Sequence, residues 1–137
     1  MSSDLPHYAF VHEVDVRFRD LDAMSHVHHG VALIYFEEAR AGFWRQVKGS
    51  ADLSAIDYVI GEMHVRYHGR IHYPARLRVG LSVTRVGNAS FDLSYEIRDE
   101  QKELLVSGSS SQVMFDYAAG RSKRIPDVVR AALSGES

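Results

Sequence analysis

The sequence predicts an α+β protein in which an antiparallel sheet of about five strands wraps around one long central helix. Two observations predict this architecture. Residues 30–47 contain no proline and favour a helix whose first two turns are apolar on every side, as in a buried helix. Five other segments have the composition of strands, and short turns join most of those that follow the helix. A sheet wrapped around the helix would cover its apolar surface.

The elements follow one another in a simple order. Residues 12–19 alternate between apolar and charged side chains and predict a half-buried strand. The long helix comes next and is expected to stop at Gly49, after which residues 49–57 form a connection. β-Branched and aromatic residues predict the remaining strands, which we place at residues 58–71, 76–86, 90–98 and 103–117. Residues 126–133 predict a short terminal helix that begins at a proline.

Length and composition limit the classes of function. A chain of 137 residues is expected to form one domain, residues 1–137, with a hydrophobic core of its own. Its 45% apolar and 25% charged residues are typical of a soluble globular protein. The formal net charge of −2 gives no electrostatic reason to expect a nucleic acid or an anionic membrane as a partner. There is no cysteine, which excludes disulfides, thiolate nucleophiles and thiolate metal sites.

The start of the chain has no sign of a targeting signal. Its first ten residues, MSSDLPHYAF, lack the basic and apolar regions of a secretory signal. No apolar run approaches the length of a membrane span. A cytoplasmic protein is therefore expected.

The residues of chemical interest lie in the stretch 19–40, RDLDAMSHVHHGVALIYFEEAR. It combines the carboxylates of Asp20 and Asp22, a loop rich in histidine, and the start of the long helix at Gly30. A helix N-terminus presents unpaired backbone N–H groups and a partial positive charge. Such a terminus is suited to stabilising an oxyanion that develops during a reaction.

This stretch carries a resemblance to a known family. Residues 22–29, DAMSHVHH, followed by residues 35–40, YFEEAR, resemble the Asp-x-x-Gly-His-Val-Asn-Asn…Tyr-Phe-Glu-x-Ala-Arg signature of hotdog-fold acyl-CoA thioesterases. The 4-hydroxybenzoyl-CoA thioesterase group is the most similar branch, and weaker similarity extends from Val14 to Leu133. The resemblance implies a hotdog fold and hydrolysis of an acyl-CoA to a carboxylic acid and free CoA. It implies no metal and no organic cofactor.

The resemblance also implies roles for individual residues. Asp22 falls on the catalytic carboxylate of the family, as nucleophile or as general base, although an aspartate in a loop more commonly caps backbone N–H groups. His29 matches the position whose backbone N–H polarises the thioester carbonyl. His26 matches the histidine of the Gly-His-Val element, where a loop-fixing hydrogen bond is as plausible a role as catalysis. Asp20 is expected to be a solvated charge at a strand end.

The helix supplies two further carboxylates, Glu37 and Glu38. A pairing with an arginine is the favoured interpretation for them. A related thioesterase branch takes its catalytic carboxylate from this helix, so a catalytic role for either glutamate stays open.

The sequence departs from the family signature at four positions. Met24 and Ser25 replace small, glycine-rich positions, while His28 and His29 replace a pair of asparagines. Met24 is expected to narrow the space beside the carboxylate of Asp22. Ser25 would alter the loop if the backbone there needs a positive φ.

Other polar clusters are interpreted without a catalytic role. The histidines of the loop and the set His64, His68 and His72 offer imidazoles, but neither arrangement completes a metal site, so no metal is expected. The serines between residues 107 and 111 lack a Gly-x-Ser-x-Gly elbow.

Basic residues are expected to meet the phosphates of CoA, and the candidates are Arg70, Arg121, Lys123 and Arg124. Edge strands left bare are an aggregation hazard, and the family covers them by pairing sheets across a two-fold axis. A homodimer or homotetramer with the site at the subunit interface is therefore expected. Two alternatives to hydrolysis stay open, a hotdog acyl-CoA dehydratase or hydratase and a catalytically silent acyl-binding protein.

Overall fold

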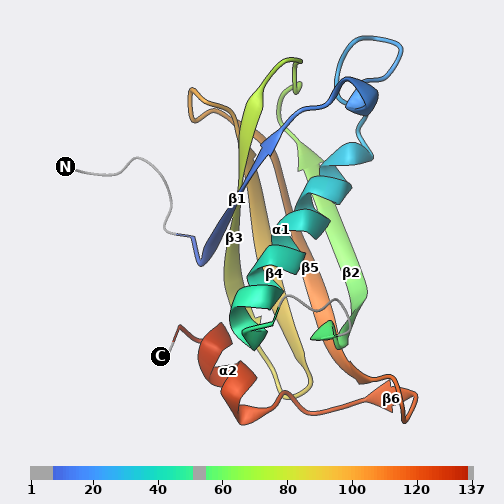
Figure 1. Cartoon of the computed structure of the whole chain (residues 1–137), viewed down its shortest axis with the longest axis vertical. Helices are drawn as coiled ribbons and strands as arrows, with labels where there is room; N and C mark the ends of the chain where they lie inside the picture. Colours follow the sequence, from blue (N-terminus) through green and yellow to red (C-terminus); the bar gives the residue numbers. More distant parts are fainter. Residues whose placement is uncertain (1–7, 51–54, 136–137) are drawn as a thin grey trace, which may run out of the picture.

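A computed structural model describes residues 8–50 and 55–135 (Figure 1). Its elements, in chain order, are β1 (Phe10–Asp15), the 3-10 helix η1 (Phe18–Asp20), α1 (Val31–Lys48), β2 (Tyr58–Tyr67), β3 (Arg76–Val86), β4 (Ser90–Arg98), β5 (Leu104–Asp116), β6 (Arg121–Ser122) and α2 (Asp127–Leu133). Among the described residues, no helix is long and apolar enough to cross a membrane.

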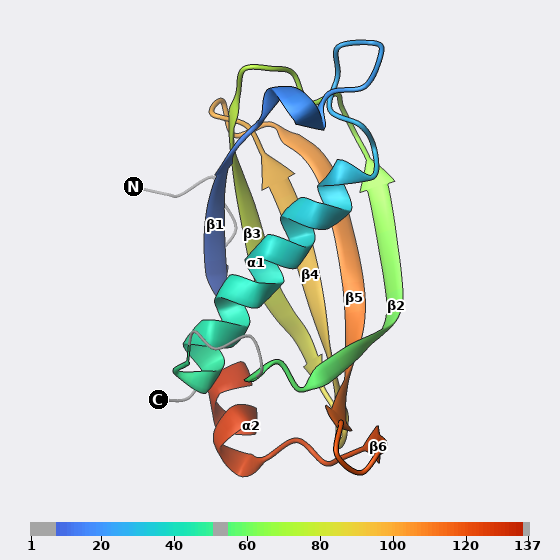
Figure 2. The same cartoon turned by 45° about the vertical axis from the view of Figure 1, so that its right-hand side comes forward.

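The strands form one antiparallel sheet in the order β1-β3-β4-β5-β2, and the short β6 pairs with β5. Helix α1 lies diagonally across one face of this sheet, and α2 lies at the end where α1 stops (Figures 1 and 2). The predicted α+β class and hotdog architecture are confirmed. Strands β1 and β2 are the two edges, so the outer side of each has no neighbour among the described residues.

The boundaries differ from the prediction where side chains redirect the chain. The segment predicted as a strand over residues 12–19 leaves the sheet after Asp15 and continues as η1. Its turn forms because the carboxylate of Asp20 accepts the backbone N–H of Arg17 at 2.9 Å. Strand β2 ends at Tyr67 instead of residue 71, and β6 was not predicted because two residues are too few to show alternation. Residues 51–54 of the predicted connection lie outside the described part of the chain.

The core lies between α1 and the sheet and is dominated by aromatic stacking. The ring of Trp44 is parallel to that of Phe91, with centroids 5.4 Å apart, and Phe36 stacks on Tyr95 at 4.5 Å. Both pairs join the helix to β4, in which every second residue is buried. A Cβ at Gly108 of β5 would lie 2.7 Å from the Phe36 ring, so glycine allows the helix to approach this closely. Burial of each large side chain contributes about 1.5–3 kcal/mol to stability.

The sheet covers only one side of α1, which corrects one expectation. Leu33 and Ile34, in the first turns of the helix, keep 38% and 47% of their surface exposed. The prediction that these turns are buried on every side is therefore wrong for a single chain. Apolar surface remains accessible where the helix begins.

A chain of buried polar groups crosses the core beside the aromatic stacks. Arg40, only 6% exposed, donates from Nη1 to the hydroxyl of Tyr95 at 3.1 Å. That hydroxyl is 2.5 Å from Oγ of Ser110, which donates to the amide oxygen of Gln112. No carboxylate in the described chain lies within ion-pair distance of Arg40. A buried guanidinium therefore depends on neutral acceptors.

Removal of the Tyr95 hydroxyl tests this dependence. Tyr95→Phe keeps the ring stack but removes the acceptor of the Arg40 Nη1–H and one of the partners of the Ser110 hydroxyl, which should lower the free energy of unfolding by about 1–3 kcal/mol. Urea denaturation followed by circular dichroism measures the change. Tyr73→Phe is the control, since Tyr73 is 43% exposed and should change stability little. Equal stability of both variants would contradict a structural role for this row of buried polar groups.

Candidate active site

The loop between η1 and α1 closes on itself as a narrow hairpin. Its two sides meet at a bridge between Leu21 and Val27, and the N–H of Asp22 donates to the carbonyl of His26 at 2.8 Å. Ser25 at the tip has a φ of 63°, in the left-handed region that favours glycine. The suspected need for a positive φ at this position is confirmed. The serine is accommodated at a backbone cost that glycine would avoid.

Asp22 presents an ionised carboxylate on this loop. Its Oδ1 accepts the backbone N–H of Met24 at 2.8 Å and that of His26 at 3.4 Å. These hydrogen bonds, the one from Met24 first, hold the pKa of Asp22 below its usual value. The side chain is exposed and does not cap α1, whose N-cap is Gly30. Asp22 therefore fixes the loop and also offers an accessible, charged oxygen.

Met24 does not enclose this carboxylate. Its side chain is 73% exposed, so the narrowing expected beside Asp22 is not seen in a single chain.

Asp20 is buried, which corrects the expectation of a solvated charge. Only 6% of its surface is exposed, and Oδ2 accepts both the N–H of Arg17 at 2.9 Å and the hydroxyl of Tyr35 at 2.7 Å. Burial acts to raise the pKa of Asp20, but these hydrogen bonds and the charge of Arg17 outweigh it and lower that pKa. Burial, together with the bond to Asp20, raises the pKa of Tyr35. Asp20 thus ties η1 to the first turns of α1.

A cavity of about 160 Å³ opens beside the loop, between the start of α1 and the segment that follows β2. Its lining combines histidines of the loop with apolar side chains: His26, Val27, His28, His29, Ala32, Tyr67, Gly69, Arg70, Ile71 and Val106. Tyr67, Ile71 and Val106 were not predicted as site residues. Tyr67 and Val106 come from β2 and β5, and Ile71 comes from the segment that follows β2, so these residues lie far along the chain from the loop and carry no local sequence signal.

His29 combines the features expected of an oxyanion donor. It lines the cavity one residue before the N-cap of α1, and its N–H donates to no acceptor among the described residues. The backbone N–H groups of the residues on either side already have acceptors. The N–H of His28 donates to the Asp20 carbonyl at 2.9 Å, and the N–H of Gly30 donates to the His28 ring at 3.0 Å. The His29 carbonyl accepts the hydroxyl of Tyr67 at 2.5 Å. The peptide around His29 is therefore held from both sides.

The other histidines of the described chain lie in separate contacts. The His26 ring, which lines the cavity, faces the ring of His72 with centroids 5.5 Å apart. His64 lies on β2, as predicted, and contacts Glu62, while His68 contacts Ser107. No group of three or more potential metal ligands occurs in residues 8–50 and 55–135.

The glutamates of α1 are placed differently from each other. Glu38 lies 3.9 Å from Arg17 and 3.5 Å from His12, so its predicted pairing with an arginine is confirmed. Glu37 is exposed.

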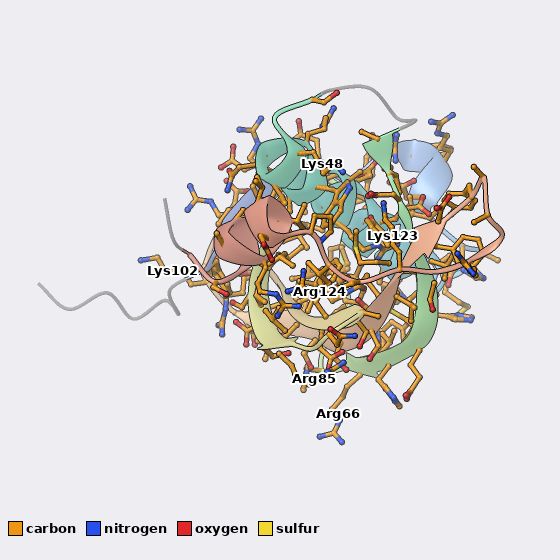
Figure 3. The ribbon with its side chains drawn as sticks, turned by 90° about the horizontal axis from the view of Figure 1, so that it is seen from below. Lys48, Arg66, Arg85, Lys102, Lys123 and Arg124 are labelled. Atoms are coloured by element: carbon orange, nitrogen blue, oxygen red, sulfur yellow. The ribbon has the colours of Figure 1, made fainter. Side chains whose placement is uncertain are left out.

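The four predicted CoA-binding residues lie at two ends of the molecule. Arg70 lines the cavity. At the opposite end of α1, Lys123 and Lys48 share one oxygen of Asp57, at 2.8 and 3.2 Å (Figure 3). An 18-residue helix separates these ends, which corresponds to roughly 27 Å.

The other two residues belong to that far end. Arg121 lies in β6, and Arg124 is paired with Asp127 at 3.1 Å. One chain therefore does not bring these two or Lys123 to the cavity that Arg70 lines.

Substitution of Ser25 tests the strain in the loop. Ser25→Gly should raise the melting temperature by about 3 °C, because a non-glycine residue at positive φ costs roughly 1 kcal/mol. Differential scanning calorimetry measures the shift. Ser134→Gly is the matched control, since Ser134 has a φ of −84° and should gain nothing. A Ser25→Gly protein that melts no higher than the parent would show that the loop carries no such cost.

Comparisons with known proteins agree with this geometry. The model of the thioesterase-like superfamily matches residues 16–133. Among solved structures, a thioesterase from Thermus thermophilus, complexed with coenzyme A and Zn, is 28% identical with a TM-score of 0.84, covering 93% of this chain and 98% of its own.

Two further solved structures are similar over most of their length. The PA2801 protein from Pseudomonas aeruginosa is 27% identical with a TM-score of 0.82, covering 93% of this chain and 99% of its own. The DHNA-CoA thioesterase from Staphylococcus aureus is 25% identical with a TM-score of 0.80, and the match covers 92% of this chain and 89% of that structure's chain. Together with the family match, these likenesses support thioester hydrolysis as the general activity. The chain belongs to the thioesterase-like superfamily.

Proposed function

We propose that this protein hydrolyses an acyl-CoA thioester to a carboxylic acid and free CoA. One observation carries the proposal: a single loop combines the ionised Asp22 carboxylate with the His29 amide, which has no acceptor among the described residues and lines an apolar cavity at a helix N-terminus. A carboxylate and an oxyanion donor are the two groups that acyl transfer to water requires.

The cavity is suited to a compact acyl group. Its lining includes Val27, Ala32 and Val106, which offer no charge to a bound acyl chain. A volume of about 160 Å³ is similar to that of an apolar cavity that admits a benzene-sized group, about 150 Å³. Arg70 at the same cavity supplies a cation for a phosphate or carboxylate of the substrate.

In the proposed reaction, the His29 N–H donates to the thioester oxygen as negative charge develops on it. Asp22 either attacks the carbonyl carbon, forming an anhydride that water then hydrolyses, or removes a proton from the attacking water. The thiolate of CoA leaves in both cases and takes up a proton. His26, whose N–H donates to Asp22, fixes the carboxylate in the loop. The reaction requires no metal ion and no organic cofactor.

A second copy of the chain would complete the site. Strand β2 is an edge whose outer side is unpaired among the described residues, and its antiparallel pairing with β2 of a partner would place the start of one strand beside the end of the other. Lys123 lies near the start of β2, because its backbone N–H donates to the carbonyl of Met114 and Met114 pairs with Tyr58, the first residue of that strand. Arg121 and Lys123 of the partner subunit would thereby approach Tyr67 and the cavity. This arrangement would join basic residues that one chain keeps apart.

Exposed apolar side chains lie along the proposed interface. Leu33 and Ile34 are exposed where α1 begins, Tyr67 is exposed at the end of β2 beside the cavity, and Ile60 is exposed near the start of β2. Apolar surface that stays exposed around a site commonly marks a contact with another protein.

The role of Asp22 is tested by Asp22→Asn. The neutral amide can neither attack nor take a proton, so turnover should fall by about 10²–10⁴-fold while the protein remains folded. Release of CoA from a panel of acyl-CoA esters, together with the melting temperature, measures both effects. Asp99→Asn is the control, because Asp99 accepts backbone N–H groups in a turn in a similar way.

Two results would contradict the proposal. A folded Asp22→Asn protein with near parental turnover would leave Asp22 with its loop-fixing role alone. If the protein altered the acyl group of a substrate without releasing free CoA, it would be a dehydratase or hydratase. If it bound acyl-CoA esters and formed no product, it would be a catalytically silent acyl-binding protein.

The proposed assembly predicts at least a dimer, and a tetramer is compatible with it. Multi-angle light scattering at micromolar concentration should give a mass of two or four chains. Ile60→Lys, on the edge of β2, should shift the protein toward monomer and reduce turnover, because charge on an edge strand opposes pairing. Val11→Lys, on the opposite edge strand β1, should leave the assembly intact. A stable monomer with full activity would exclude the composite site.

A further inference from the structure

His28 connects the two segments that hold the proposed oxyanion donor. Its N–H donates to the Asp20 carbonyl at 2.9 Å, and its own carbonyl accepts the N–H of Val31 at 2.9 Å. Its ring nitrogen Nδ1 accepts the N–H of Gly30 at 3.0 Å. The peptide of His29 lies between the two residues that this ring joins, so the position of the imidazole affects the position of that peptide.

The ring of His28 fits closely where it lies. It stacks on the ring of His29 with centroids 4.3 Å apart and planes 25° from parallel. A Cβ added to Gly30 would be 3.2 Å from Nδ1 of His28, closer than an ordinary van der Waals contact. The hydrogen bond therefore uses the close approach that glycine allows.

We propose that His28 is a positioning residue for thioester hydrolysis, whose neutral imidazole holds the Gly30 amide and thereby fixes the His29 peptide that polarises the substrate. This inference rests on the proposed function. His28 itself need not touch the reacting atoms. Its effect on the reaction passes through the two peptides that follow it.

The chemistry of imidazole makes this device sensitive to acid. Nδ1 accepts a hydrogen bond only while it carries no proton, and an imidazolium presents donors on both nitrogens. A protonated His28 would turn an N–H toward the N–H of Gly30 and place a positive charge at the positive end of the α1 dipole. Histidine side chains in general change charge between about pH 5 and 8. Protonation of Nδ1 would therefore remove the acceptor of the Gly30 N–H, and the hydrogen bond would be lost with it.

Several other titratable groups surround His28. Asp22 and His26 belong to the same loop, and His29 stacks on the ring. Tyr67, which bonds the His29 carbonyl, and Arg70 face the loop across the cavity. The carboxylate of Asp20 is directed to Arg17 and Tyr35, and His72 faces His26. Because these groups can also shape the pH profile, the contribution of His28 must be isolated by substitution.

His28→Asn separates the hydrogen bond from the titration. An asparagine oxygen can accept the N–H two residues along the chain, as in an Asx turn, and does not gain a proton in this pH range. At pH 8 the variant should keep kcat within about 3-fold of the parent. Between pH 8 and 5.5 the parent should lose about 10-fold in kcat and the variant should lose much less, since the acceptor survives. His12→Asn, on the opposite edge strand β1, is the matched control and should keep the parental profile.

His28→Leu removes the acceptor at every pH. A misplaced donor typically costs about 10–100-fold, so kcat should fall across the profile while KM changes little. If this variant fails to fold, the His28→Asn profile still decides the question. An unchanged loss of activity in His28→Asn, or a parental kcat in folded His28→Leu, would overturn the proposal.

A measurement without substrate separates this proposal from the proposed function. In ¹⁵N-labelled protein the amide resonance of Gly30 should move as the pH is lowered from 8 to 5.5, and this movement should disappear in His28→Asn. If the protein hydrolyses acyl-CoA but the Gly30 resonance does not move with pH, the role of His28 alone would be overturned. A titrating Gly30 resonance in a protein that hydrolyses no acyl-CoA would overturn the proposed function, and the catalytic role of His28 with it.

Discussion

The contact on which the rest of the structure depends is the stacking of α1 on β4. Trp44 on Phe91 and Phe36 on Tyr95 join the two ends of the helix to one central strand, so the helix is fixed in direction as well as position. Gly108 lets the helix come close enough for the second stack to form. Because the stacks fix the helix, they also fix where its N-terminus meets the sheet. That meeting point is the candidate active site.

The loop before α1 is tied down by polar groups instead of apolar packing. The buried carboxylate of Asp20 bonds η1 to Tyr35 of the helix, and Asp22 fixes the outer side of the hairpin through Met24 and His26. Two aspartates two residues apart thus have different tasks because one side chain is enclosed and the other is exposed. Hydrogen bonds keep the pKa of both low, so both stay charged at neutral pH. This loop differs from an ordinary connection because it carries both an exposed, ionised Asp22 and a His29 backbone amide that has no acceptor among the described residues.

The single chain leaves apolar surface uncovered beside the cavity that Arg70 lines. Leu33 and Ile34 are exposed at the start of α1, and Tyr67 is exposed at the end of β2. The other basic candidates lie at the far end of α1. There, burial acts to raise the pKa of the Asp57 carboxyl, and its hydrogen bonds to Lys123 and Lys48 outweigh that effect and lower the pKa. An edge-to-edge pairing of β2 would address both facts together. In the proposed dimer, the site would therefore draw on residues of both chains.

The sequence by itself determined the α+β class, the helix to within one residue at each end and the bounds of β3 and β4, because alternation and helical periodicity are local signals. It also pointed to Asp22 and His29, through a short motif whose residues are adjacent in the chain. Only the tertiary structure decided the burial of Asp20, the exposure of Leu33 and Ile34, and the residues from β2 and β5 that line the cavity. These features depend on which distant segments meet, and a helix that is apolar all round does not reveal which of its sides the sheet will leave open. The hydrogen bond from the Gly30 N–H to Nδ1 of His28 also belongs to the features that the tertiary structure decided, since it depends on a ring orientation that no sequence pattern specifies.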